Sequence, residues 1–196
     1  MAQIAPYGSW KSPITSDLIV SSFVGLSQPL VDGDDCYWIE MRPSEAGRCV
    51  IVKRDAQGVM TEVNPAPFNA RTRVHEYGGG DYAVRAGSVY FSNFSDQRLY
   101  VCEGEAEPRP ITPKAEVRYA DAVFDETRKR LICVREDHRD AGREAVNALA
   151  FVRLEGNETP GEELVSGNDF YSSPRVSPDG SRLAWLTWNH PNMPWD

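Results

Sequence analysis

The sequence predicts an all-β fold. Strand-forming residues fill short periodic segments, and 15 glycines and 14 prolines are distributed among the 196 residues. A tight-turn signal precedes an apolar alternating strand four times, with the strands at 36–41, 88–93, 130–136 and 182–188. Recurrence roughly every 40–55 residues is typical of propeller blades. We therefore predict a partial β-propeller of about three and a half four-stranded antiparallel blades.

The first element expected is a lead-in segment over residues 1–27. Pro13 and Ile14 are followed by three polar residues and a short apolar run, which predicts a short helix capped by Thr15 or Ser16. The remaining residues, 28–196, are predicted to form the incomplete propeller. Its blades are expected at about 28–74, 75–115, 116–168 and, in part, 169–196.

Each complete blade is expected to hold four short strands. The predicted strands are 29–31, 36–41, 49–54 and 60–63; 81–84, 88–93, 98–103 and 108–112; 118–124, 130–136, 147–154 and 162–166; and 171–176 and 182–188. A single sheet cannot bury both of its faces, so each blade depends on its neighbours. The fourth unit has two strands, so the ring is not expected to close within this sequence.

Blade topology predicts where the connecting loops lie. Turns between the first and second strands share one face of the ring, and the second-to-third loops and blade links share the other. Three chemically rich segments should therefore lie together on one face. They are 75–80, 137–146 and 189–196.

Composition excludes several classes of function. The net charge of −8 makes nucleic acid an unfavourable partner. No apolar run approaches about 20 residues, so no membrane partner is expected. The first residues show no basic stretch followed by an apolar one, so we expect no secretory signal and a cytoplasmic location.

The cysteines and histidines predict no metal site and no cofactor. Cys36, Cys49, Cys102 and Cys133 show no CxxC spacing, and we expect buried reduced thiols. A Cys36–Cys49 bridge across a hairpin is the alternative. The three histidines lack metal-ligand spacing, and residues 136–140, which include His138, are expected to form a solvated charged loop.

Residues 71–80 are the first candidate functional segment. Glu76 could bind a substrate ammonium group, and Arg71 or Arg73 a carboxylate, by charge-assisted hydrogen bonds. His75 and Tyr77 complete the predicted substrate-contacting set. The alternative is structural: the three glycines allow a tight crossing into an inner strand, while the Arg and Glu side chains pair among themselves.

The second candidate segment is 185–196, which holds three tryptophans and two prolines. Aromatic density in a loop often marks a docking surface. We predict a domain-facing loop there, formed by Trp188, Asn192, Trp195 and Asp196. In a complete blade, the rings could equally fill the gap between sheets.

Three stretches resemble a known family: SPITSDLIV at 12–20, RTRVHEYGGG at 71–80 and YSSPRVSPDGSRLAWLTWNHPNMPWD at 171–196. They are similar to the N-terminal propeller region of prolyl oligopeptidase-family serine peptidases. The dipeptidyl-aminopeptidase and acylaminoacyl-peptidase-like enzymes look nearest. The resemblance implies a seven- or eight-bladed propeller that restricts access to short peptides, followed by an α/β-hydrolase domain with a Ser-Asp-His triad. It also implies that Glu76 is the carboxylate for a free amino terminus.

No catalytic residue can be placed on this chain. It has no GxSxG nucleophile elbow, so we expect the chain alone to be inactive. The expected function is the propeller portion of a serine exopeptidase or oligopeptidase, which gates short peptides and supports a catalytic domain absent from this chain. The alternatives are a non-enzymatic interaction or scaffold propeller, and a small self-contained β protein that closes by pairing two copies. The open blade faces of the fragment also predict self-association.

Overall fold

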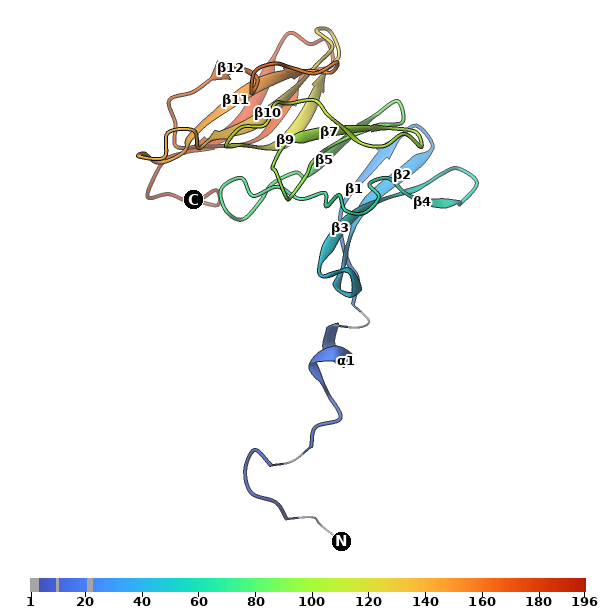
Figure 1. The fold of residues 1–196 in the computed structure, drawn as a ribbon. Helices are drawn as coiled ribbons and strands as arrows, with labels where there is room; N and C mark the ends of the chain where they lie inside the picture. Colours follow the sequence, from blue (N-terminus) through green and yellow to red (C-terminus); the bar gives the residue numbers. More distant parts are fainter. Residues whose placement is uncertain (1–3, 10, 21–22) are drawn as a thin grey trace.

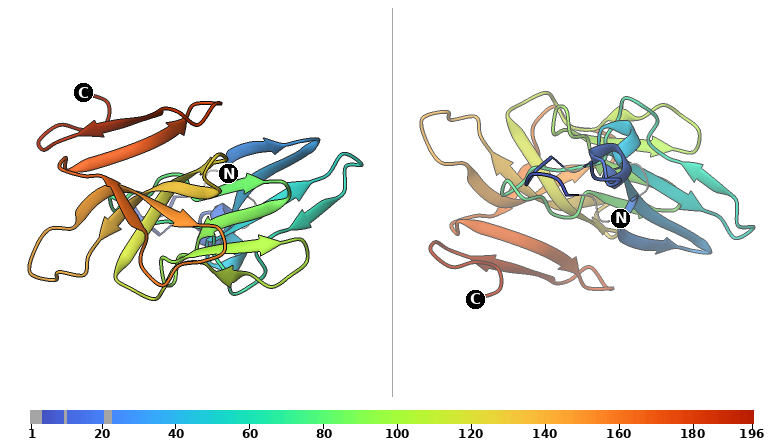
Figure 2. Two further views of the ribbon diagram at one scale, coloured as in Figure 1. Left: turned by 90° about the horizontal axis from the view of Figure 1, so that it is seen from above. Right: turned by 90° about the horizontal axis from the view of Figure 1, so that it is seen from below.

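The computed structural model describes residues 4–9, 11–20 and 23–196. These residues form antiparallel sheets with one short α-helix and one 3-10 turn, so the all-β prediction is confirmed (Figure 1). Three sheets have four strands and the last has two, and in every sheet consecutive strands are neighbours. The sheets follow one another in chain order without closing into a ring (Figure 2). This is the predicted partial propeller.

The strands lie close to the predicted positions. The first sheet contains β1 (Gly25–Asp32), β2 (Asp35–Arg42), β3 (Arg48–Arg54) and β4 (Met60–Glu62), with the 3-10 turn η1 (Pro43–Glu45) between β2 and β3. The second contains β5 (Tyr82–Arg85), β6 (Ser88–Ser92), β7 (Leu99–Glu103) and β8 (Arg109–Pro110). The third contains β9 (Val117–Asp125), β10 (Arg130–Asp137), β11 (Val146–Arg153) and β12 (Glu162–Val165), and the fourth β13 (Phe170–Val176) and β14 (Leu183–Trp188).

The core consists of three apolar clusters, one between each pair of neighbouring sheets. Ile51 of β3 and Phe91 of β6 are fully buried in the first cluster. Tyr119 and Leu131 belong to the second, and Tyr171 of β13 to the third. Burying one such side chain stabilises the fold by about 1.5–3 kcal/mol. The sheets therefore stack through their apolar faces, as the blade prediction requires.

Polar contacts link the first strands of successive sheets. Irregular positions in β1, β9 and β13 place Gln28, Asp121 and Ser173 at φ of 51°, 56° and 52°. The Gln28 amide donates to the Asp81 carboxylate over 2.6 Å. The Asp121 carboxylate accepts from the backbone N–H of Gly80 at 2.5 Å and of Ser173 at 2.8 Å. These contacts fix the relative positions of the sheets where the first strands meet.

The helix α1 (Ser16–Val20) lies where the sequence predicts one. The backbone N–H of Leu18 donates to Thr15 Oγ1 at 3.1 Å, so Thr15 is the capping residue. Figure 1 shows this segment extending away from the sheets, and the Ile14 and Ile19 side chains are exposed. Among the described residues, no helix is long and apolar enough to cross a membrane.

The cysteine predictions need correction. All four cysteines are free, so a Cys36–Cys49 bridge is wrong. In the β2–β3 hairpin, Cys36 lies opposite Arg54 and Cys49 opposite Met41, which places the two thiols at opposite ends. Cys36 is also exposed, whereas the other three are buried as expected.

Candidate functional site

The three segments predicted to share a face line one cleft of about 630 Å³. Its wall contains residues of segments 75–76, 136–147 and 167–170, together with His190. We call it the loop cleft. The residues that line this cleft confirm the expectation that parts of 75–80, 137–146 and 189–196 lie together. They do so because the chain runs up and down through each sheet and returns to the same face after every second strand.

The triple glycine positions the first cleft segment. A Cβ atom on Gly80 would lie 2.9 Å from the Asp121 carboxylate, and one on Gly79 would lie 3.0 Å from the Cβ of Ala120. Only glycine allows so close a crossing onto β9. The structural reading of these glycines is therefore confirmed, and they hold the preceding His75 and Glu76 at the cleft.

Arg118 of β9 is the centre of a charge network at this wall. Its Nη1 lies 2.6 Å from Glu76 Oε1 and 3.1 Å from Glu136 Oε1. His138 Nε2 lies 2.5 Å from the same Glu136 oxygen. The hydrogen bond from Arg118 lowers the pKa of Glu76, so this carboxylate is ionised at neutral pH.

The predicted pairing within 71–80 is wrong, because Glu76 pairs with Arg118 of the next sheet. The guanidinium groups of Arg71 and Arg73 instead lie 5.4 and 5.5 Å from the ring of Phe94. Neither arginine is among the described residues that line the loop cleft. The structure therefore brings His75 and Glu76 to the cleft and separates both arginine side chains from it.

An aromatic cluster joins the two candidate segments. The ring of His75 lies edge-on to Phe170 at 5.2 Å and to Trp188 at 5.7 Å. Phe170 also stacks on Trp188 at 5.4 Å and contacts His190 at 4.7 Å. Tyr77 lies 5.7 Å from His75, with its side chain mostly exposed. The link between the first and second sheets thus meets the fourth sheet at one point.

The rest of the predicted domain-facing loop lies on the surface. Trp195 is 75% exposed, and Asn192 and Asp196 are also exposed. The Asp196 carboxylate accepts from the backbone N–H of Met193 at 2.7 Å, which orders the turn. These three residues do not line the loop cleft, whereas Trp188 packs on its wall.

Sequence reasoning missed Glu136, Asn147 and Asp169. Glu136 was expected where the predicted strand 130–136 passes into a solvated loop, but β10 continues through Asp137, and Glu136 is only 4% exposed. Its Oε2 accepts from the backbone N–H of His75 at 2.6 Å. Asn147 is buried, and Asp169 accepts from both the backbone N–H and Nδ1 of His190. Their spacing carries no signal, because the sheet register brings them together.

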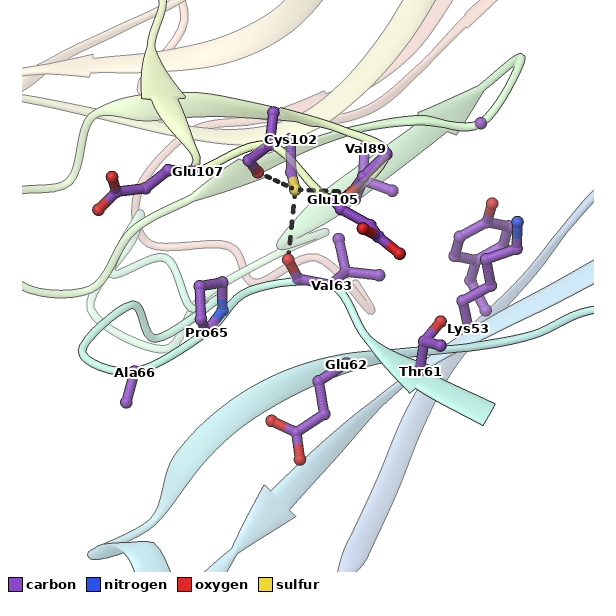
Figure 3. Close-up of a pocket in the computed structure, with 14 residues that line it drawn as sticks. Lys53, Thr61, Glu62, Val63, Pro65, Ala66, Val89, Cys102, Glu105 and Glu107 are labelled. Atoms are coloured by element: carbon purple, nitrogen blue, oxygen red, sulfur yellow. Dashed lines mark hydrogen bonds between the residues drawn. The ribbon is translucent and has the colours of Figure 1, made fainter. Parts of the chain in front are cut away.

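A second cleft, of about 800 Å³, lies between the first two sheets (Figure 3). The Cys102 thiol there lies 3.3 Å from the carbonyl oxygens of both Val63 and Ala106. Burial raises the pKa of Cys102, so the thiol is protonated and a poor nucleophile. Lys53 is paired with Asp35 at 2.6 Å. The loop cleft is therefore the better candidate site. In the described part of the chain, no group of residues is arranged to hold a metal ion.

No protein-family model and no curated protein sequence matches the chain. Solved structures do match it. A puromycin-hydrolyzing peptidase of Mycobacterium tuberculosis is 42% identical, with a TM-score of 0.85, over 98% of this chain and 32% of that one. A puromycin hydrolase is 37% identical, with a TM-score of 0.84, over 99% of this chain and 32% of that one. TolB from Acinetobacter baumannii, at 11% identity and a TM-score of 0.60, shows the fold alone.

These matches and the stacked sheets define the class: the chain is a partial β-propeller whose structural neighbours are peptidases of the prolyl oligopeptidase family. The resemblance seen in the sequence is thereby confirmed. Within that class, the chain is similar to the puromycin-hydrolyzing peptidases, and it spans about a third of their length.

Proposed function

We propose that the chain is the propeller portion of a serine exopeptidase or oligopeptidase. In this role it gates the access of short peptides and supports an α/β-hydrolase domain that the chain itself does not contain. The observation that carries the proposal is the convergence of the two candidate segments: His75 and His190 both line the loop cleft, and the ring of His75 contacts Trp188.

The charge of the loop cleft suits the amino end of a peptide. Carboxylates of Glu76, Glu144 and Asp169 line it, and Glu76 Oε1 is the oxygen that pairs with Arg118. The second oxygen of Glu76 can therefore accept from a substrate ammonium group. Arg71 and Arg73 lie beside Phe94 and do not line the cleft. They could therefore bind a substrate carboxylate only outside it.

The exposed residues at the end of the chain suit a contact with the catalytic domain. Trp188 is held by Phe170 and His75, whereas Asn192, Trp195 and Asp196 present their side chains to solvent. A mostly exposed tryptophan is a common anchor of protein interfaces. We assign this surface to the hydrolase domain.

Hydrolysis assays test the proposal. The 196-residue chain and a longer product that includes whatever its gene encodes downstream are incubated with puromycin and with aminoacyl and acylaminoacyl chromogenic amides. We expect no turnover by the chain alone and serine-dependent turnover by the longer product. Turnover by the 196 residues would refute the proposal, and an inert longer product without a GxSxG sequence would favour the scaffold alternative.

A further inference from the structure

Glu76, the proposed ammonium-binding residue, lies in a turn with an unusual backbone conformation. His75 and Glu76 have φ angles of 55° and 65°, and two consecutive non-glycine residues in this left-handed region are uncommon because the Cβ atom approaches the backbone. The backbone N–H of Glu76 closes the turn by donating to the Arg73 carbonyl oxygen at 3.0 Å. Such a conformation persists only where surrounding contacts hold it, and it is concentrated at functional sites.

Two residues of the third sheet supply those contacts. Arg118 of β9 and Glu136 of β10 lie directly opposite each other in the sheet register, and both side chains are largely buried. Glu136 Oε2 accepts from the backbone N–H of His75 at 2.6 Å. Arg118 Nη1 donates to the Arg73 carbonyl oxygen at 2.8 Å and to Glu76 Oε1 at 2.6 Å. The pair therefore holds both the backbone and the carboxylate of the turn.

These contacts leave one oxygen of Glu76 available. Among the described residues, only Arg118 bonds to this carboxylate, and it does so through Oε1. The Glu76 side chain is 76% exposed. The charged side chains that line the loop cleft are mostly acidic, with one arginine: Glu76, Glu136, Glu144, Asp169 and Arg143. The free oxygen and the negative charge both suit a cationic group.

We propose that Arg118 and Glu136 are positioning residues for an ammonium site at Glu76. They hold the turn in its left-handed conformation, so that Glu76 Oε2 is set in place before a peptide amino terminus arrives. Both act through Glu76 rather than on the ligand. A group that is ordered in advance loses less entropy on binding, which raises the affinity. This inference rests on the proposed function in taking a peptide amino terminus as the ligand.

Charge and positioning predict opposite effects of removing Arg118. As a charge alone, Arg118 competes with the ammonium group for Glu76, so Arg118→Gln would strengthen ammonium binding. As a positioning residue, Arg118 orders the carboxylate, so the same change weakens ammonium binding. The direction of the change in Kd therefore separates the two roles.

The test titrates the 196-residue chain by calorimetry with alanylphenylalanine amide and with its N-acetyl form, which lacks the ammonium group. At about pH 6.5 the amino terminus of the first peptide is protonated. We expect the parent chain to bind the free peptide about tenfold more tightly than the acetylated one, since a hydrogen bond to a charged group is worth about that factor. Arg118→Gln should weaken binding of the free peptide about tenfold and leave the acetylated peptide unchanged.

Two further variants make the test specific. Arg118→Lys keeps a cationic nitrogen with N–H donors, so the free peptide should bind within about threefold of the parent value. Arg85→Gln is the matched control, because it removes an ion pair of the same kind between the second and third sheets, from Arg85 to Glu126 at 2.6 Å. Neither of these two residues lines the loop cleft, so Arg85→Gln should change no Kd.

A measurement on the parent chain keeps the proposal testable if Arg118→Gln does not fold by circular dichroism. The backbone N–H groups of His75 and Glu76 are both hydrogen-bonded. Hydrogen exchange at these two positions should therefore be slower than in an unstructured peptide. Exchange at the unstructured rate would show that the turn is not held and would overturn the positioning role.

Four titration results would also overturn it. They are free-peptide binding by Arg118→Gln that equals or exceeds that of the parent, Arg118→Lys as weak as Arg118→Gln, equal binding of the two peptides by the parent, and no binding of either peptide at millimolar concentration. Any of these together with turnover by the longer product would remove the positioning role and leave the catalytic assignment. The expected pattern of Kd values without turnover by the longer product would remove only the catalytic assignment.

Discussion

Asp81, just before β5 of the second sheet, shows how a half-buried carboxylate responds to the stacking of sheets. Its oxygens accept from the backbone N–H of Thr72 and from the Gln28 amide, both at 2.6 Å. Burial nevertheless raises the pKa of Asp81 to about 6, because the loss of hydration outweighs these two hydrogen bonds. The folded protein therefore binds a proton here more tightly than the unfolded chain does.

The sign of the pH dependence follows from this shift. Between about pH 4 and pH 6, the folded state holds more protons at Asp81 than the unfolded state, so the free energy of unfolding falls as pH rises. We expect a loss of about 2–3 kcal/mol across this range. Urea unfolding of Asp81→Asn should show a smaller loss, whereas Asp34→Asn, at an exposed turn, should match the parent chain. Identical pH profiles for Asp81→Asn and the parent would contradict this account.

Gly80 tests the close crossing onto β9. An alanine there places Cβ 2.9 Å from the Asp121 carboxylate and 3.3 Å from the Asp121 Cα. We expect Gly80→Ala to lower the free energy of unfolding by about 1–3 kcal/mol, the usual cost of overpacking. Gly142→Ala, whose added Cβ meets only Asp140 at 3.5 Å, is the control and should stay within about 0.5 kcal/mol. Equal free energies of unfolding for Gly80→Ala and the parent chain would show that β9 shifts to accommodate the added Cβ without loss of stability.

At the scale of elements, the first strands of the sheets are joined by their irregular positions rather than by a continuous ladder. Asp121 is the central case, because one carboxylate accepts from Gly80 ahead of β5 and from Ser173 in β13. Its own backbone N–H donates to the Gly80 carbonyl at 2.9 Å. A single side chain therefore fixes the second, third and fourth sheets relative to one another.

Removing this carboxylate should loosen the last sheet most. Asp121→Ala leaves two backbone donors without their partner, and we expect a loss of about 2–5 kcal/mol. Hydrogen exchange should rise more in β13 and β14 than in β2 and β3, since Asp121 bonds directly to Ser173 of β13 and the last sheet has only two strands. Asp140→Ala, in an exposed loop, should leave the exchange pattern unaltered. A uniform change across all sheets would argue against a local role for Asp121.

At the scale of the molecule, both ends of the row of sheets are open. Leu26 and Val31 of β1 are 70% and 71% exposed, and Leu186 of β14 is 57% exposed. In the other three sheets the second strand pairs with a third, whereas β14 has none. Exposed apolar faces and an unpaired edge strand favour association with other β-structure.

We expect the 196-residue chain to self-associate through these open faces. Light scattering after size exclusion should give a mass above the 21.9 kDa of one chain, rising with concentration. Leu186→Lys should shift the chain toward the monomer, because a charge at an edge strand opposes pairing. Val59→Lys, at an exposed apolar position in the β3–β4 turn, is the control. A monomer at every concentration would show that the exposed faces are stable in water.

The sequence by itself determined the strands, their order and the face on which the loops 75–80, 137–146 and 189–196 lie. It could do so because the alternation of apolar and polar residues and the turn signals are local properties of the chain. The resemblance to the prolyl oligopeptidase family followed from three stretches, one of which includes the His75-Glu76 pair that lines the cleft. The tertiary structure decided the partners: Arg118 for Glu76, Trp188 beside His75, and the burial of Glu136 and Asn147. These contacts depend on strand register and on how one sheet stacks on the next. Both bring together residues that are far apart in the sequence and whose spacing does not predict that they touch.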